Sequence, residues 1–430
     1  MVERHSFLNR MLAWLRMGSR EEISDSLSSS KVPQRYIWGI LLGFSLYHFA
    51  ASIFWQFGSF YLFAGIGETA FLLIGLIGGL PVLIGLLGVY FWGSLSDRWH
   101  RRIPFIILGF IAQTISFFLY IFIQDSFTFL VVTCVAYLFS LAAVPMANAY
   151  LTEARTFKGG AVGLLLATSS VGWSVGAFTG GFLFTLIGMS GLFLLGGFAF
   201  IAGALMIGII VREIPQTTRV SQPEEVPSRS EIIPRPWWKP LTWILLVLAA
   251  AVAISSLGVN GFAYFFGVYL VSEIGGTPLM IGIANGFASL FGLGVTLAAG
   301  HGSDRIGRKP VILVGFAGYA MFMLVYLFIF DPFVAMLLWF IPLYPLISTA
   351  GYAAAADLSK AERRGRAMST IATANSIGQA FGPIIGGALV QFVFFTLRSN
   401  LVFALLMNAI AFLIVLLIVP ETLKHEKKKQ

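Results

Sequence analysis

The chain consists largely of long stretches without a charged side chain, and this feature limits its fold more than any other. A bilayer core about 30 Å thick requires about 20 mostly apolar residues per helix. Lipid offers no partner to backbone groups, so only helices and closed barrels can span it. Because the stretches are continuously apolar rather than alternating, they predict helices. The sequence therefore predicts an all-α polytopic membrane protein with 12 transmembrane helices. We expect spans at about 37–62, 69–92, 104–123, 128–150, 161–187, 191–211, 241–271, 278–299, 311–330, 333–356, 367–390 and 400–419.

The charged residues predict how these spans are oriented. Only 11% of the residues are charged and 58% are hydrophobic, whereas soluble domains carry roughly 25% charged residues. If the amino terminus is cytoplasmic, Arg398 is the only one of the 28 Lys and Arg residues that falls outside. The net charge of +9 then reflects topology and contact with anionic lipid, and no nucleic-acid partner is expected. We expect a cell-membrane protein with both termini in the cytoplasm.

Two pairs of similar patterns indicate that the two halves of the chain are repeats of each other. The charged stretch GSLSDRWHRR at 93–102 returns as GHGSDRIGRK at 300–309, in the same place between the second and third spans of each half. The glycine pattern of the fifth span returns in the eleventh at nearly the same separation. A proline-containing, mixed-charge segment separates the halves. The expected units are an N-terminal segment 1–36, a six-helix bundle 37–211, a linker 212–240, a second six-helix bundle 241–419 and a tail 420–430.

The repeated glycine patterns allow two interpretations. Small residues four positions apart let helices approach closely in lipid, which would be a packing role. They could also let a helix bend where moving halves meet. The residues with this predicted helix-flexing role are Gly172, Gly176, Gly180 and Gly181 in the fifth span, and Gly378, Gly382, Pro383, Gly386 and Gly387 in the eleventh.

The spans, the linker and the loop pattern G-x-x-x-D-R-x-G-R-K/R together resemble the major facilitator superfamily (MFS) of secondary transporters. The second copy is complete, and the first has His100 where the second glycine of the pattern belongs. The resemblance implies that these stretches gate the cytoplasmic side, with Asp97 facing the start of the eleventh span in an outward-open state. The predicted gating residues are Gly93, Asp97, Arg98 and Arg101 in the first copy, and Gly300, Asp304, Arg305, Gly307 and Arg308 in the second.

The fifth-span glycines are similar to the antiporter signature of drug-efflux members of that family. Ala177 replaces the proline of the signature, which persists in the repeat copy as Pro383. A second efflux signature, an arginine within the fourth span, is missing, because 129–150 contains no basic residue. The resemblance to efflux members is therefore partial.

Polar side chains at helical spacing predict a substrate site. Such groups are costly in lipid and tend to face an interior cavity, and sites in repeat-built transporters lie near the midplane. Helix–helix hydrogen bonding is the alternative role for each of them. His48 could carry a proton or be a neutral, hydrogen-bonded imidazole. The predicted substrate-binding residues are His48, Ser52, Trp55, Gln56, Trp173, Asn260, Tyr264, Asn375 and Gln379.

The remaining sequence features favour transport over catalysis. The spans contain neither paired aspartates nor an HExxH motif, which an intramembrane enzyme would be expected to show. The sequence also lacks a GxxxxGK[ST] loop, so we do not expect ATP to be the direct energy source. Cys134 is the only cysteine, so we expect no cysteine-based metal site, and no cofactor. No acid lies near the middle of a span, which favours a neutral or weakly polar substrate. We expect a monomeric exporter of lipophilic or drug-like compounds by alternating access. Sugar or small-metabolite transport is the alternative, and proton coupling stays open.

Overall fold

A computed structural model describes residues 32–154, 158–214, 243–359 and 363–423, and these ranges are helical without a strand. Most of the predicted N-terminal segment, linker and tail lies outside them.

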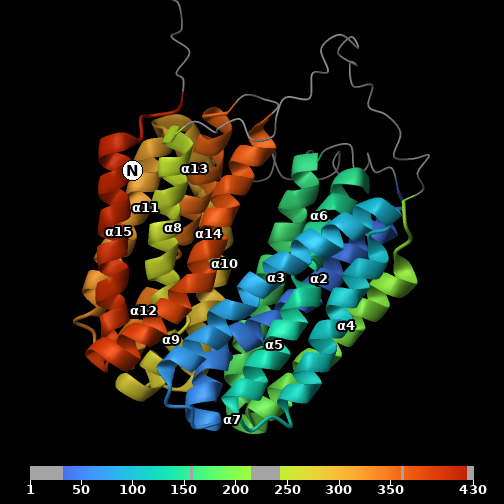
Figure 1. Ribbon diagram of the computed structural model, residues 1–430, viewed down its shortest axis with the longest axis horizontal. Helices are drawn as coiled ribbons and strands as arrows, with labels where there is room; N and C mark the ends of the chain where they lie inside the picture. Colours follow the sequence, from blue (N-terminus) through green and yellow to red (C-terminus); the bar gives the residue numbers. More distant parts are fainter. Residues whose placement is uncertain (1–31, 155–157, 215–242, 360–362, 424–430) are drawn as a thin grey trace, which may run out of the picture.

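Figure 1 shows two groups of helices, α2 to α7 and α8 to α15, which meet at one end and diverge toward the other. The first group contains α2 (Gln34–Phe60), α3 (Phe71–Trp99), α4 (Ile103–Tyr120), α5 (Ser126–Ser140), α6 (Ala143–Ala154) and α7 (Lys158–Ile210). The second contains α8 (Trp243–Ala263), α9 (Phe266–Val268), α10 (Pro278–Ile306), α11 (Arg308–Tyr326), α12 (Pro332–Trp339), α13 (Tyr344–Asp357), α14 (Arg364–Leu389) and α15 (Arg398–Ile418). Short π-helical turns, η1 (Tyr61–Gly65), η3 (Tyr269–Glu273) and η5 (Val390–Phe394), follow α2, α9 and α14.

The described residues contain 11 helical segments long and apolar enough to cross a membrane, against the 12 spans expected. The difference lies in α7, which contains both the fifth and the sixth predicted span. Gly188 has a φ of 65° and interrupts the helix between them. Glycine tolerates this left-handed conformation without a steric cost, so the chain can reverse without a loop. The twelve-helix fold is thus retained.

The charged stretches are more helical than expected. We placed them in the connections after residues 92 and 299, but α3 continues to Trp99 and α10 to Ile306. That expectation was wrong because a charge ends the apolar run without ending the helix. The helices stop at residues with positive φ, His100 at 53° and Gly307 at 109°.

Two spans are broken. The fourth is divided at residues 141–142 between α5 and α6, and the tenth at residues 340–343 between α12 and α13. Pro342 and Pro345 explain the longer break, because proline lacks the backbone donor and disfavours helix at the residue before it. Irregular backbone at membrane depth is tolerated only where protein buries it or where it lines a cavity.

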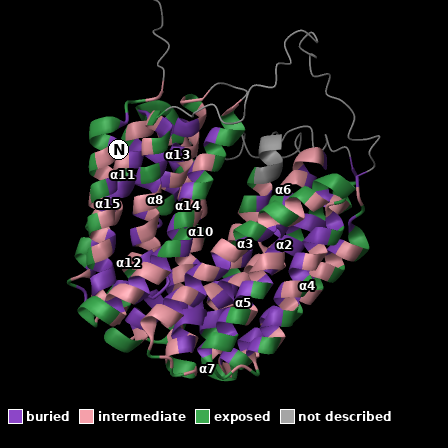
Figure 2. Cartoon of the chain, viewed as in Figure 1, coloured by how far each residue is buried: buried purple, intermediate pink, exposed green. Residues whose placement is uncertain are grey.

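Burial follows the division into two groups. Buried residues lie inside each group and exposed ones on the outer faces (Figure 2). Many exposed side chains are large and apolar, such as Phe122 and Leu417, as expected where the solvent is lipid. The larger cluster of buried apolar residues joins both groups, whereas the smaller one lies within the second group alone.

Candidate functional site

The two halves are in close contact where α3 begins and α14 ends. A Cβ atom at Gly79 would collide with the carbonyl oxygen of Ala380, and one at Gly75 with that of Pro383. From the other side, a Cβ at Gly387 would collide with the carbonyl oxygen of Phe71. Glycine is therefore what allows the two backbones to touch.

A second contact joins α7 to the start of α10. A Cβ at Gly181 would lie 2.8 Å from the Cα of Gly282. Ser174, buried on α7, donates a hydrogen bond of 2.8 Å to the carbonyl oxygen of Gly286. The two contacts relate the halves in the same way, since each joins the second span of one half to the fifth span of the other.

Among the described residues, three side-chain hydrogen bonds cross between the halves, and each joins a side chain to a backbone group. Besides the bond of Ser174, the hydroxyl of Ser59 donates to the carbonyl of Tyr264 at 2.5 Å. The amide oxygen of Gln391 accepts a bond of 2.8 Å from the backbone N–H of Leu72, in the first turn of α3. None of the ion pairs among the described residues joins the two halves. Hydrogen bonds and glycine contacts therefore close this end. We had not predicted Gln391, which lies just past the expected end of the eleventh span.

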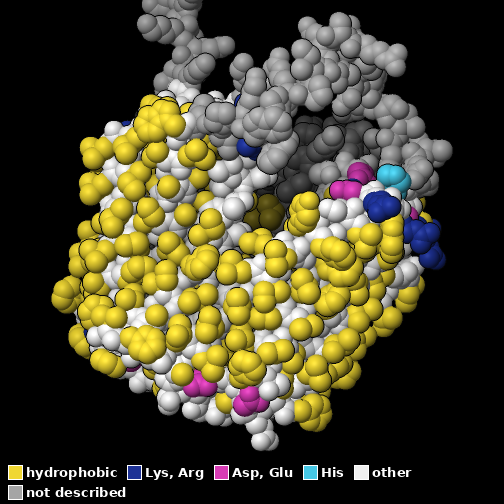
Figure 3. Space-filling model, in the orientation of Figure 1, with side chains coloured by type: hydrophobic (Ala, Val, Ile, Leu, Met, Phe, Trp, Pro, Cys, Tyr) yellow, Lys and Arg dark blue, Asp and Glu magenta, His cyan; other side chains and the backbone are white. Residues whose placement is uncertain are grey.

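The opposite end, where α3 and α10 carry the charged stretches, is open. Figure 3 shows the surface hollowed between the two groups there, with Lys and Arg together with acids at its rim and further acids at the closed end. Between α8 and α14, Ala253, Thr373 and their neighbours line a cavity of about 290 Å³. Thr373 is exposed.

The predicted substrate residues of the first half lie at two levels. Farther from the closed end than Gln56, His48 and Trp173 bring their ring centroids to 6.3 Å, and both are half-buried. Ser52 is fully buried and donates to the carbonyl of Phe49 in its own helix. At the closed end Gln56 is 6% exposed, and neither its amide nitrogen nor its amide oxygen has a hydrogen-bond partner among the described residues.

The predicted residues of the second half divide in the same way. Asn260 donates to the carbonyl of Ser256 at 2.8 Å, and the Ser256 hydroxyl donates to the carbonyl of Asn375 at 3.2 Å. Tyr264 is buried at the closed end, with its ring 5.6 Å from that of Trp55 and its hydroxyl unpartnered in the described part of the chain. Gln379 is exposed on α14. The structure thus joins Trp55 to Tyr264 and Asn260 to Asn375 through Ser256, but it does not gather all nine residues in one pocket.

The repeated glycines let their helices approach neighbouring helices closely. A Cβ at Gly172 or Gly176 would collide with the backbone of α2, and one at Gly378 would collide with Ser256 on α8. A Cβ at Gly180, Gly382 or Gly386 would lie 2.6, 2.9 or 2.6 Å from Phe57, Asn260 or the carbonyl oxygen of Gly261, respectively. Apart from Gly188, α7 keeps helical backbone angles throughout. These contacts favour the packing interpretation, and the helix-flexing role stays a prediction.

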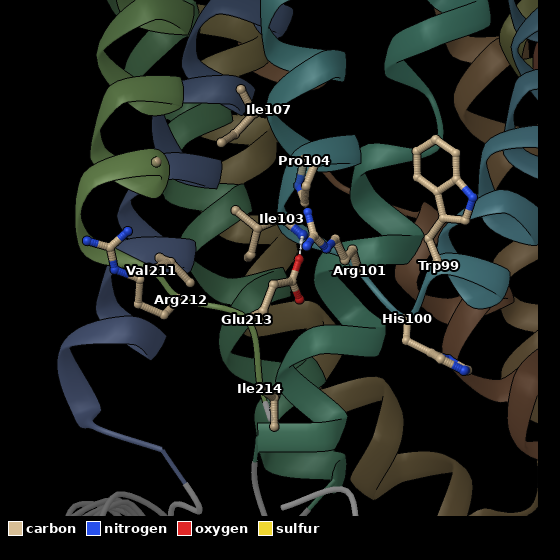
Figure 4. Close-up of a pocket in the computed structure, with 11 residues that line it drawn as sticks. Trp99, His100, Arg101, Ile103, Pro104, Ile107, Val211, Arg212, Glu213 and Ile214 are labelled. Atoms are coloured by element: carbon tan, nitrogen blue, oxygen red, sulfur yellow. Dashed lines mark hydrogen bonds between the residues drawn. The ribbon is translucent and has the colours of Figure 1, made fainter. Parts of the chain in front are cut away.

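At the open end of the first half, one arginine holds two acids. Arg102 pairs with Asp97 at 2.5 Å and with Glu153, on α6, at 3.1 Å. Partial burial by itself lowers the pKa of Arg102, but the bonds to Asp97 and Glu153 outweigh it and raise the pKa above its usual value. Glu213, after α7, accepts the backbone N–H groups of Arg102 and Ile103 at 2.7 Å each, at the start of α4. Figure 4 shows the bond to Ile103. A negative charge at the start of a helix interacts favourably with the helix dipole and so stabilises α4.

The second half repeats this network. Arg308 pairs with Asp304, and with Asp357 on α13 at 3.1 Å. Glu421, after α15, accepts the backbone N–H groups of Arg308 and Lys309 at 2.9 and 3.1 Å, at the start of α11. Partial burial by itself raises the pKa of Glu421, but backbone hydrogen bonds from Leu423, Arg308, Lys309 and Thr422 outweigh it and hold that pKa below its usual value.

The structure therefore brings five residues that were not among the predicted gating residues into the ion-pair and hydrogen-bond network of the charged stretches. They are Arg102, Glu153, Glu213, Asp357 and Glu421. Arg98, Arg101 and Arg305 are exposed and make no ion pair among the described residues. Gly93 has open space around it, and the nearest atom to a Cβ at Gly300 would be 3.7 Å away. Glu213 and Glu421 could have been suspected from the sequence, because each directly follows the last span of its half.

Comparisons with known proteins agree with this architecture. The family model of the Major Facilitator Superfamily matches residues 40–347 and again 248–430. Zinc induced facilitator-like 1 of Arabidopsis thaliana is 33% identical over 165 residues, which is 36% of this chain and 33% of that protein. Multidrug resistance protein MdtH of Shigella boydii is 29% identical over 136 residues, 30% of this chain and 32% of that protein. The matches thus span about a third of each relative.

A bacterial homologue of the human lysosomal transporter Spinster, solved in an inward-facing and occupied conformation, superposes with a TM-score of 0.70. It is 16% identical, and the superposition covers 89% of this chain and 95% of that one.

Proposed function

The chain belongs to the Major Facilitator Superfamily, and on that premise we propose that it exports neutral, lipophilic or drug-like molecules by alternating access. It is a multi-pass membrane protein with the family and fold of small-molecule transporters, not of enzymes. We further propose that it works as a monomer in the cell membrane with both termini in the cytoplasm. The bundles 37–211 and 241–419 are then the two units that move.

One observation carries the mechanism: the halves are closed at one end and open at the other. The three side-chain hydrogen bonds that join the halves within the described ranges lie at the closed end, as do the glycine contacts. The charged stretches lie at the open end. With the basic residues on the cytoplasmic side, this conformation is inward-open. Alternating access requires a second conformation in which the closed end separates and the charged end closes.

The charged stretches are suited to hold that second conformation. The side chains of Asp97 and Asp304 are 67% and 68% exposed, although each is paired with an arginine of its own half. An exposed carboxylate can also meet the positive end of a helix in the other half, an interaction of about 0.3–1 kcal/mol. Such an energy biases two conformations and still allows a cycle. We propose that Asp97 meets the start of α14 in the outward-open state.

The substrate proposal rests on the polar groups inside the spans. They are aromatic rings, amides and hydroxyls, and the central parts of the spans carry no Asp or Glu. A neutral lipophilic molecule suits such a lining. The same amides, Asn260, Asn375 and Gln379, could also bind hydroxyl groups, so a sugar or small metabolite is the second candidate. Proton-coupled export would require a titrating group, and His48 is the residue that we propose for it.

The test is transport by Asp97→Asn in reconstituted vesicles, with Asp304→Asn beside it. We expect Asp97→Asn to slow turnover while expression and substrate binding stay close to wild type. Wild-type transport rates in that variant would contradict the latch. A thermal-shift screen across drugs, sugars and organic acids would identify the substrate class. Repeating the best hit with and without a proton gradient then tests coupling, and export that ignores the gradient would contradict it.

The closed end offers a matched test of the same cycle. Gln391→Ala removes the bond to α3, so we expect the outward-open population to rise. Spin labels on the two halves at the charged end would report this as a shorter distance between them. Thr185→Ala is the control, because Thr185 is exposed near the end of the fifth span, and its recorded hydrogen bond stays within its own helix. An unchanged distance distribution in Gln391→Ala would remove Gln391 from the gate.

A further inference from the structure

A cavity of about 190 Å³ lies inside the second half, at the depth where the tenth span is broken. Its walls come from α8, α10, α11 and the segment between α12 and α13. Residues 340–343 of that segment are irregular, and irregular backbone in a span is expected where it lines a cavity. Broken helices near the midplane are also where transporters bind their substrates. The break and the cavity are two observations that indicate the same place.

The polar groups of the cavity differ in how well they are satisfied. Asn285 is fixed, because its amide oxygen accepts a bond of 3.0 Å from the indole N–H of Trp339 and its nitrogen donates to Ile281 at 2.9 Å. By contrast, the hydroxyls of Ser289 and Tyr319, both half-buried, and of Tyr344, which is 48% exposed, have no hydrogen-bond partner within the part of the chain that the structure describes. Three unpartnered hydroxyls thus lie around one cavity.

The third span of the first half, α4, is arranged differently from its counterpart α11. Its buried amide at a comparable depth, Gln113, donates a bond of 2.7 Å to Ser140, and both residues are buried. The polar groups there satisfy one another. In the second half the half-buried hydroxyls of Ser289 and Tyr319 have no partner among the described residues, so they are available to bind a ligand that enters the cavity.

The lining of the cavity specifies the chemistry of that ligand. No lining side chain is charged, and Trp339, Phe322 and Tyr319 present aromatic rings. A charged group here would be desolvated without a partner, which is strongly unfavourable. Rings pack well against other rings, and the free hydroxyls can bond to a hydroxyl or an amide.

We propose that this cavity is a subsite for a neutral ring carrying hydroxyl or amide groups, as one part of the transported molecule. Whole ligand pockets usually measure roughly 300–1,000 Å³, so this cavity holds a single ring while the rest of the molecule lies outside it. The inference rests on the proposed transport function, because it names the chemical class that the transporter selects. It adds α11 and the tenth-span break to the elements that contact substrate.

Cysteine protection tests the subsite directly. Cys134 is the only cysteine, so Cys134→Ala with Ser289→Cys places one thiol at the cavity wall. The labelling rate with N-ethylmaleimide is measured with three probes that share one ring: neutral 4-hydroxybenzamide, anionic 4-hydroxybenzoate and cationic 4-hydroxybenzylamine. We expect the neutral probe to slow labelling at least fivefold and the charged probes to leave it unchanged. Thr373→Cys in the same background is the control, since Thr373 lines the other cavity, and we expect no protection there.

A second measurement keeps the proposal testable if the thiol at position 289 reacts poorly. Titration of 4-hydroxybenzamide into detergent-purified protein, followed by thermal shift, gives an apparent Kd. One hydrogen bond contributes about 1 kcal/mol, so Tyr319→Phe should weaken binding roughly fivefold, and Thr373→Ala should not. Equal protection by the charged probes, or an unchanged Kd in Tyr319→Phe, would overturn the subsite. If drug-like compounds are exported while these results are negative, only the subsite fails. If the neutral probe binds as expected but no neutral compound is exported, the proposed function fails instead.

Discussion

The two charged turns at the open end form the same network on different backbones. In the first half Asp97 and Arg102 are five residues apart, and the helix ends at His100, whose φ is 53°. In the second half Asp304 and Arg308 are four residues apart, and the turn is the single residue Gly307, whose φ is 109°. Each arginine nevertheless holds two acids, and a third acid after the last span of the half binds the start of the next helix.

This difference shows that the interactions, rather than the motif letters, define the structure. The sequence pattern aligns Arg101 with Arg308, whereas the structure gives Arg102 the role of Arg308. The extra residue is absorbed by His100, which belongs to the residue types that enter the left-handed region more readily than most. The departure from glycine in the first copy is therefore accommodated locally.

Removing the bridging arginines should have the largest effect. Arg102→Ala removes the ion pairs to Asp97 and Glu153, and Arg308→Ala removes those to Asp304 and Asp357. Because hydrogen bonds to charged groups contribute about 1.5–3 kcal/mol, we expect each variant to lose stability of that order. Thermal unfolding in detergent, followed by tryptophan fluorescence, measures it. Arg98→Ala and Arg305→Ala are the controls, and equal losses in them would mean that cationic charge alone matters.

The next largest effect should distinguish the turn at Gly307 from the turn at His100. Gly307→Ala should lose about 1–3 kcal/mol, because its φ suits glycine and the new Cβ would lie 2.8 Å from the carboxyl carbon of Glu421. His100→Ala keeps a side chain where one is already accepted, so we expect less than about 1 kcal/mol of change. The same unfolding measurement applies, and similar losses in both variants would refute the distinction.

A smaller effect should depend on pH. The pKa of Glu421 is lowered in the folded protein, so its contribution is present above the unfolded value and is lost as pH falls through the folded value. Glu421→Gln should therefore cost about 0.3–1 kcal/mol at pH 7, as expected for an acid at a helix start. The difference from wild type should shrink below roughly pH 4. Unfolding midpoints of both proteins from pH 7 to pH 3.5 measure this, and a constant difference would contradict it.

The smallest effect should be a gain. His100→Gly removes the cost of a left-handed conformation, about 1–2 kcal/mol, and adds the entropy cost of glycine, about 0.4–1 kcal/mol. We therefore expect a slight stabilisation, of about 1 kcal/mol or less, with unchanged transport. A clear loss of stability would show that the imidazole itself makes a necessary contact.

Much of the fold was predictable because the membrane imposes it locally. The apolar runs predicted the helical class, and the repeated stretches predicted the two halves. Where the prediction erred, local sequence was a poor guide: α3 and α10 continue past their apolar runs. The boundary between the fifth and sixth spans was predicted correctly, because Gly188 lies between 161–187 and 191–211. The candidate site was less predictable. The spacing of polar residues located the right helices but not the cavity beside Asn285 and Trp339.

The sequence by itself determined which segments enter the membrane, that the halves repeat and that charge gathers at one side. These properties depend on the free energy of transferring each segment from water to lipid. The residues of the segment itself set that free energy. Only the tertiary structure decided which end is closed, since Gly79 meets Ala380 and Leu72 meets Gln391 across hundreds of residues. It also decided that Glu213 and Glu421 cap distant helices and that three hydroxyls stay unpartnered at one cavity. Such contacts depend on how two bundles dock, and no local pattern encodes that geometry.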